Sequence, residues 1–139
     1  MMVDVAVVGA GPAGLFTALG LVEKGGLEVA LFDRGPDLHE RRCPARETGM
    51  CVRCRLCSLL SGWGGAGAFS DGKLTYSPDV GGWLAEAIGR EKLMELMERV
   101  DELYLRFGAP KKLYGGDEDE VAELERRATK AGLKLIPQK

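Results

Sequence analysis

The amino-acid sequence predicts an α/β fold that opens with a strand, a helix and a second strand. Three patterns within residues 1–38 predict it. A nearly continuous β-branched apolar run over 3–8 is typical of a strand buried on both faces. Apolar residues then recur three and four positions apart over 15–22, which predicts one face of a helix. A second short apolar run, 28–32, predicts a parallel strand, and the three elements form a βαβ unit.

The remaining residues divide into two regions. Residues 39–82 hold all four cysteines and the densest glycines, so we expect a Cys- and Gly-rich loop region there. Residues 83–139 predict a helical segment, with a short helix near 83–88 and longer helices over 93–107 and 117–131. The run 133–136 predicts a short strand that Pro137 ends. We expect all three regions to belong to one incomplete domain.

Composition excludes several classes of protein. The 139 residues are 45% hydrophobic and 29% charged with a net charge of −2, which argues against disorder and against a nucleic-acid binder. Residues 5–22 carry no charge, but four glycines and a proline interrupt them and no basic segment precedes them. We therefore expect no membrane segment or export signal, a cytoplasmic location, and cysteines that are reduced or ligated.

A glycine motif follows the first strand. The pattern GxGxxG comprises Gly9, Gly11 and Gly14, with Pro12 and Ala13 inside it. Gly9 would allow the tight turn, Gly11 the close approach of a pyrophosphate, and Gly14 close packing of helix and strand. The helix N-terminus would then hold the phosphates. Because an acid lies 19 residues beyond Gly14, we expect Asp33 to bind ribose hydroxyls and residues 1–38 to form a dinucleotide-binding βαβ unit.

The glycine motif has alternative interpretations. The motif is also compatible with a glycine-rich turn in an ordinary α/β domain. Asp33 is also compatible with the role of a helix- or turn-capping residue. Arg34 raises the option of the 2′-phosphate of NADP. Asp33 would repel that phosphate, so we assign Arg34 to solvent or to the edge of the adenine.

The cysteines form a second cluster with the spacing C-x7-C-x2-C-x2-C. They are Cys43, Cys51, Cys54 and Cys57. Four thiolates within 15 residues would suit zinc or an iron–sulfur cluster, and five nearby arginines, among them Arg41 and Arg46, would favour the thiolate form. A redox-active pair and free structural thiols remain open. His39 would serve as a ligand only if one cysteine is spare, and a solvated histidine is the alternative.

Residues 61–73 form a second glycine cluster. Such a density of glycine exposes backbone N–H groups and permits close approach to a ligand. A flexible loop is the alternative, but Trp63 and Phe69 are typical of docked side chains.

These motifs carry a resemblance to a known family. The stretch Val5-Ala6-Val7-Val8-Gly9-Ala10-Gly11-Pro12-Ala13-Gly14-Leu15 resembles the opening of FAD-dependent oxidoreductases of the glutathione-reductase type. Residues 43–74, 80–84, 104–110 and 132–137 resemble a group of FAD-dependent dehydrogenases in which a cysteine-bearing segment precedes a similar glycine loop. The resemblance implies a Rossmann-like fold and an FAD cofactor, with NAD(P) as the alternative. It also implies that the second glycine cluster faces the cofactor through Gly64, Gly65, Ala66, Gly67, Ser70, Asp71 and Lys73.

The resemblance also sets limits. Such flavoproteins are much longer, and their substrate domain and a late glycine-aspartate segment have no counterpart here. We therefore expect the N-terminal portion of an oxidoreductase that alone binds FAD weakly or not at all and turns over no substrate. No catalytic residue can be named. A metal-binding module is one alternative, and a non-catalytic fragment that pairs with a missing C-terminal part, a partner chain or a second copy is another.

Overall fold

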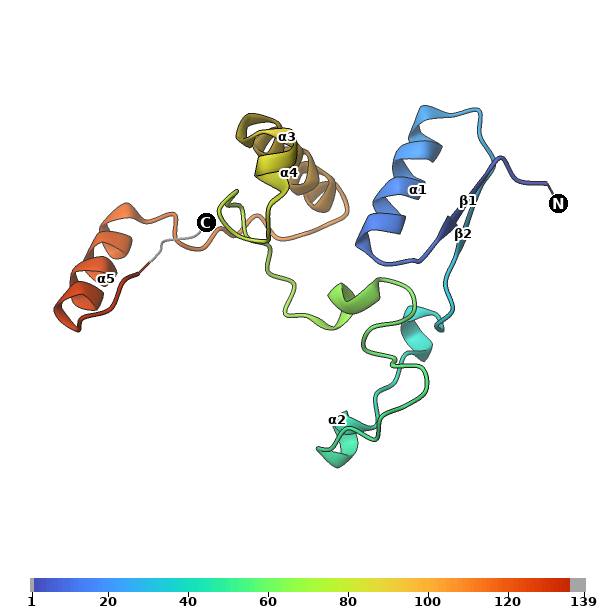
Figure 1. Cartoon of the computed structure of the whole chain (residues 1–139), viewed down its shortest axis with the longest axis horizontal. Coiled ribbons are helices and arrows are strands. Elements are labelled where there is room, and N and C mark those ends of the chain that lie inside the picture. The colour runs from blue at the N-terminus through green and yellow to red at the C-terminus, as the bar shows by residue number, and fades with distance from the viewer. Residues whose placement is uncertain (1, 136–139) are drawn as a thin grey trace. The chain divides into compact units, whose positions relative to one another are not determined.

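The computed structural model describes residues 2–135, which form two compact units that divide between Lys73 and Leu74. The first unit opens with strand β1 (Val5–Val8), helix α1 (Pro12–Lys24) and strand β2 (Val29–Phe32) (Figure 1). The strands pair in parallel, with Val5 opposite Val29 and Val8 opposite Phe32. The predicted strand–helix–strand order is confirmed.

Polar contacts set the ends of this small sheet. The Asp4 carboxylate accepts a hydrogen bond from the Glu28 N–H at 2.7 Å, which ties the start of one strand to the start of the other. At the opposite end the Gly9 N–H donates to the Phe32 carbonyl at 2.7 Å. The parallel register is therefore held at both ends by atoms just outside the paired residues.

Burial of the sheet differs from the prediction. Helix α1 packs on the face that carries Val7, whose Cγ1 lies 3.5 Å from the position of a Cβ built on Gly14. On the other face Val8 is 85% exposed, and neighbouring Phe32 is 54% exposed. The prediction of a strand buried on both faces is wrong for the described chain, because one helix can cover only one face of two strands.

Residues 38–69 contain short helical turns joined by loops. They are the 3₁₀ helix η1 (Leu38–Glu40), helix α2 (Ala45–Thr48) and the 3₁₀ helix η2 (Gly65–Phe69). The Asp37 carboxylate accepts from the Leu38 N–H and starts η1. Gly49, at φ +74°, ends α2.

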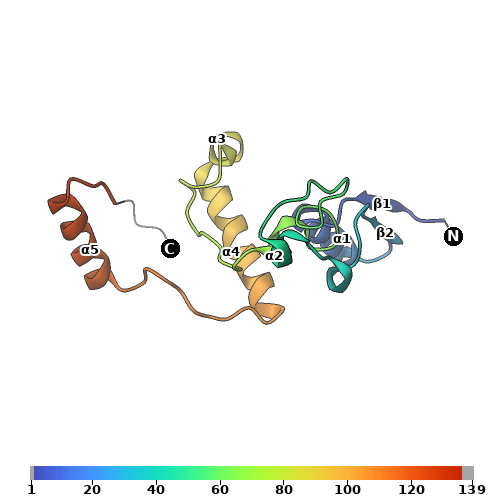
Figure 2. The same ribbon diagram turned by 90° about the horizontal axis from the view of Figure 1, so that it is seen from below.

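The second unit is helical. It contains α3 (Leu84–Ile88), α4 (Arg90–Arg106) and α5 (Glu118–Lys130), and α3 packs on α4 (Figure 2). Gly89, at φ +85°, separates α3 from α4 as predicted. The Asp117 carboxylate caps α5 by accepting from the N–H groups of Asp119 and Glu120 at 3.0 and 3.1 Å.

The predicted strand over 133–136 does not form in the part that the structure describes. Residues 133–135 have no strand geometry, and 136 lies outside the described residues. The Leu133 N–H instead donates to the Ala128 carbonyl at 2.9 Å, which completes the end of α5. Among residues 2–135, no helix has the length and apolar character needed to cross a membrane.

Candidate functional site

The glycine turn after β1 leads directly into the N-terminus of α1. Gly9 has φ +102°, a backbone conformation that favours glycine, and Gly11 occupies the N-cap position. Pro12 follows at the first helical position, where its missing N–H breaks no helical hydrogen bond. The first turn of α1 carries no acidic residue. The positive end of the helix dipole is therefore not neutralised by a side chain of its own first turn.

Gly14 is the most tightly enclosed glycine of this turn. A Cβ built on it would lie 1.8 Å from the Gly9 carbonyl oxygen. No side chain fits there without displacing backbone. The close approach of helix to turn, which puts the first-turn N–H groups beside Gly9, thus depends on glycine at this position.

Asp33 closes the turn from the end of β2. One carboxylate oxygen accepts from the Ala10 N–H and the other from the Gly35 N–H, both at 2.8 Å. These hydrogen bonds stabilise the charged form and therefore hold the pKa of the Asp33 carboxyl below its usual value. The hydrogen bond from Ala10 has the largest effect on this pKa. A carboxylate has about four acceptor sites, so Asp33 can hold both backbone groups and still accept from a ligand hydroxyl.

The second glycine cluster lies against the first. The Gly64 N–H donates to the Ala10 carbonyl at 2.8 Å, and a Cβ built on Gly65 would lie 2.9 Å from the Gly11 Cα. Ala10 itself is fully buried. Backbone segments more than fifty residues apart are thereby packed together at the N-terminus of α1. Sequence reasoning expected both segments to face one cofactor but missed this direct contact, whose only signal was glycine in both partners.

The remaining predicted cofactor residues occupy the edges of this arrangement. Arg34 donates through Nη2 to the Ser61 hydroxyl at 3.3 Å, so it contacts the second glycine cluster. The Ser70 hydroxyl donates to the Gly67 carbonyl at 2.8 Å and ends η2. Asp71 and Lys73 form an exposed ion pair at 3.0 Å, which holds the pKa of the Asp71 carboxyl below its usual value.

Arg41 is a buried residue that sequence reasoning did not single out. Its side chain donates to the carbonyls of Ser58 and Trp63 at 2.8 and 2.5 Å. Its guanidinium carbon also lies 4.6 Å from the centre of the Phe69 ring. In the sequence it was one of five arginines near the cysteines, and nothing in that pattern distinguished it from the others.

The cysteines do not form a metal site in the described structure. Cys43 and Cys57 are half-buried, Cys51 and Cys54 are exposed, and all four are free thiols. Within residues 2–135, no three His, Cys, Asp or Glu side chains are grouped so as to hold a metal ion. His39 lies exposed in η1. The geometry therefore gives no support to a zinc or iron–sulfur site.

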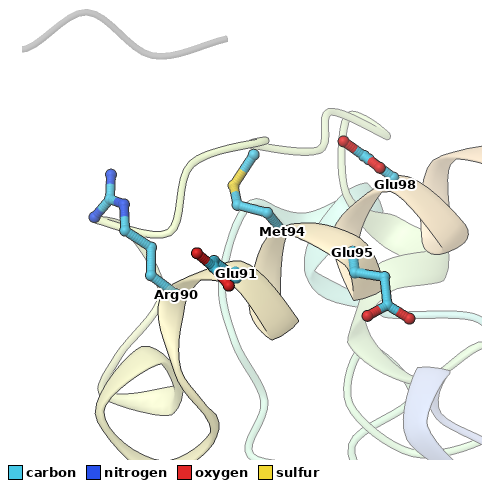
Figure 3. A pocket seen from close by; sticks show the side chains of 5 residues that line it. All are labelled: Arg90, Glu91, Met94, Glu95 and Glu98. Carbon is cyan, nitrogen blue, oxygen red and sulfur yellow. The ribbon is translucent and has the colours of Figure 1, made fainter.

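A shallow depression lies on α4 and is lined by the side chains of that one helix (Figure 3). The lining residues are Arg90, Glu91, Met94, Glu95 and Glu98. None of the predicted cofactor residues lines it.

Comparison with known proteins gives one family. Residues 4–137 match the family model described as "FAD dependent oxidoreductase". A curated protein of Clostridium beijerinckii, named "Uncharacterized protein", is 46% identical over 70 residues. That alignment covers 50% of this chain but only 13% of the relative's length. No solved structure matches the chain.

Proposed function

The chain belongs to the FAD dependent oxidoreductase family, and from that membership we propose that its two packed glycine segments hold the ADP portion of FAD. The observation that carries the proposal is the contact between the segments. Gly64 donates to the Ala10 carbonyl, and Gly65 lies on Gly11, at the N-terminus of α1. Backbone N–H groups beside an open helix N-terminus form a site for an anionic pyrophosphate.

The residues present fit such a ligand. Glycine at 11 and 65 lets the two backbones pack in direct contact at the N-terminus of α1, and no acid in the first turn of α1 opposes a phosphate. Asp33 retains acceptor capacity for ribose hydroxyls while it holds Ala10 and Gly35 in place. Arg34 and residues 66–73 would line the edges of the site.

Bound FAD would supply the redox chemistry, and this chain would supply binding and orientation. The first turn of α1 would compensate the pyrophosphate charge through its N–H groups. Asp33 would fix the ribose, and through the Ala10 hydrogen bond it would also keep the glycine turn closed. We propose that the chain represents the nucleotide-binding portion of an oxidoreductase of the dehydrogenase type. We expect no turnover from these 139 residues alone.

Titration of the ¹⁵N-labelled chain with FAD, followed by NMR, tests the proposal even if binding is weak. FAD should shift the amide signals of residues 9–11, 13, 14 and 64–67, with saturation only above micromolar concentrations. ADP should shift the same signals, whereas FMN, which lacks the adenosine half, should not. Gly11→Asp is the matched variant, because a carboxylate beside the pyrophosphate should abolish the shifts by repulsion.

Two results would overturn the proposal. One is the absence of shifts at residues 9–14 with millimolar FAD. The other is an equal response of the unaltered chain and the Gly11→Asp variant. Submicromolar binding of FAD would contradict the narrower expectation that this chain alone binds weakly.

A further inference from the structure

Arg41 is a buried cation without a charged partner. It is 4% exposed, whereas its neighbours Arg42 and Arg46 are exposed. No acidic side chain among residues 2–135 forms an ion pair with it, and its Nη2 nitrogen has no hydrogen-bond partner in that part of the chain. Its other contacts are neutral carbonyls and an aromatic ring.

Burial of such a charge is costly in free energy. Guanidinium groups lose strong hydration on burial, and hydrogen bonds to carbonyls recover only part of it. An apolar side chain of similar length would avoid this cost. The position of Arg41 is therefore better explained by what it holds in place than by the stability it adds.

The contacts of Arg41 lie at both ends of η2 (Gly65–Phe69). Before η2, its Nη1 nitrogen donates to the Trp63 carbonyl, and a Cβ built on Gly62 would lie 2.9 Å from the Arg41 Cδ. At the end of η2, its guanidinium lies over the Phe69 ring, which the exposed Arg46 guanidinium also contacts at 4.6 Å from the ring centre. One planar group thus contacts the entry and the exit of this turn.

The segment that Arg41 holds is the one that packs on the glycine turn. The Trp63 N–H donates to the Pro36 carbonyl at 3.3 Å, and the next residue, Gly64, donates to the Ala10 carbonyl at 2.8 Å. The Trp63 carbonyl faces Arg41 while its N–H faces Pro36, so both sides of this peptide segment are fixed. Because the Trp63 carbonyl and the Gly64 N–H belong to the same peptide group, a shift of this carbonyl at Arg41 would directly displace the donor of the hydrogen bond to Ala10.

We propose that Arg41 is a positioning residue of the cofactor site. It fixes the segment from Gly62 to Phe69 against the glycine turn of residues 9–14, and it thereby sets the affinity for FAD without contacting FAD. This inference rests on the proposed function.

The test compares Arg41→Met and Arg41→Lys with Arg42→Met, which removes a charge from the exposed neighbouring position. Amide hydrogen exchange without cofactor reports loop docking, and the FAD titration reports affinity. In Arg41→Met, exchange at Gly64 should accelerate and FAD affinity should fall, each about tenfold or more, as expected for loss of a charge-assisted hydrogen bond. Arg41→Lys should retain only part of the protection at Gly64 and part of the FAD affinity, because an ammonium cannot reproduce the planar set of donors of a guanidinium. Arg42→Met should change neither.

The Val5 amide separates positioning from general stability, because its hydrogen bond to the Glu28 carbonyl lies at the end of the sheet away from the glycine turn. Exchange there should stay unchanged in Arg41→Met. Equal acceleration at Val5 and Gly64 would overturn the proposal in favour of a general structural role. Unchanged Gly64 exchange and FAD affinity would also overturn it. If FAD shifts no signal in the unaltered chain, the proposed function fails, while the exchange data still decide whether Arg41 positions the loop.

Discussion

Each of the two units of this chain is held together internally by a different kind of contact. In residues 2–73, backbone groups far apart in the sequence meet directly, as the Gly64 N–H and the Ala10 carbonyl do. In residues 74–135, most hydrogen bonds lie within a helix or at its ends, and the Tyr76 hydroxyl to Asp101 at 2.6 Å is a longer-range exception. Burial and the Asp101 carboxylate raise the pKa of Tyr76 to about 12. The first unit should therefore be sensitive to added atoms, and the second to lost helix caps.

The largest effect is expected from Gly14→Ala. The added Cβ would lie 1.8 Å from the Gly9 carbonyl oxygen, so helix and turn must separate. We expect a loss of about 3 kcal/mol or more in the free energy of unfolding, measured by urea denaturation. Gly20→Ala is the matched control, because the same helix has nothing within 4 Å of a Cβ there. It should stabilise the chain by roughly 0.5–1 kcal/mol, and similar behaviour of both variants would contradict the packing of α1.

A smaller effect is expected from Gly65→Ala. Its φ of +57° strains an alanine by about 1–2 kcal/mol, and the Cβ would lie 2.9 Å from the Gly11 Cα. Exchange at the Gly64 amide should accelerate while β1 and β2 stay paired. In the control Gly67→Ala the Cβ would have an ordinary contact of 3.7 Å with Pro12, so this exchange should not change. Unchanged exchange in Gly65→Ala would argue against the docking of the two glycine segments.

Asp33→Asn should destabilise the first unit in a pH-dependent way. The Ala10 and Gly35 N–H groups lower the folded-state pKa of Asp33 below its unfolded value. The contribution of ionised Asp33 to the free energy of unfolding is therefore complete above about pH 5. It shrinks as pH falls past about 3.9 and is lost below the lowered folded-state pKa. Denaturation at several pH values should show the stability difference between the unaltered chain and Asp33→Asn narrowing in acid. A difference that is constant down to the acid limit would contradict this role.

The smallest effect is expected in the second unit, from Asp117→Ala. Loss of the cap of α5 should cost about 1 kcal/mol of helix stability. Circular dichroism should show less helix, while the NMR signals of residues 9–14 stay in place. Glu125→Ala, a change in the middle of the same helix, should leave the helical signal intact, since alanine is a strong helix former. Equal losses in both variants would show that the cap is not what starts α5.

Much of the fold could be predicted because its signals are local. Apolar spacing located α1, α4 and α5, and Gly89 located the break between α3 and α4. The burial of β1 could not be predicted, since a continuous apolar run shows that a strand can be covered but not what covers it. The run 133–136 failed as a strand over its described residues because Leu133 bonds to Ala128 instead.

The candidate site divides in the same way. The sequence by itself determined the glycine turn, its place before a helix and the acid at the end of β2, because these depend on conformations and spacings encoded by neighbouring residues. Only the tertiary structure decided that Gly64 bonds to Ala10, that both oxygens of Asp33 hold backbone N–H groups, and that Arg41 alone of the arginines near the cysteines is buried. The physical reason is that backbone hydrogen bonds and burial depend on which distant segments meet. Glycine permits such a meeting without specifying its partner.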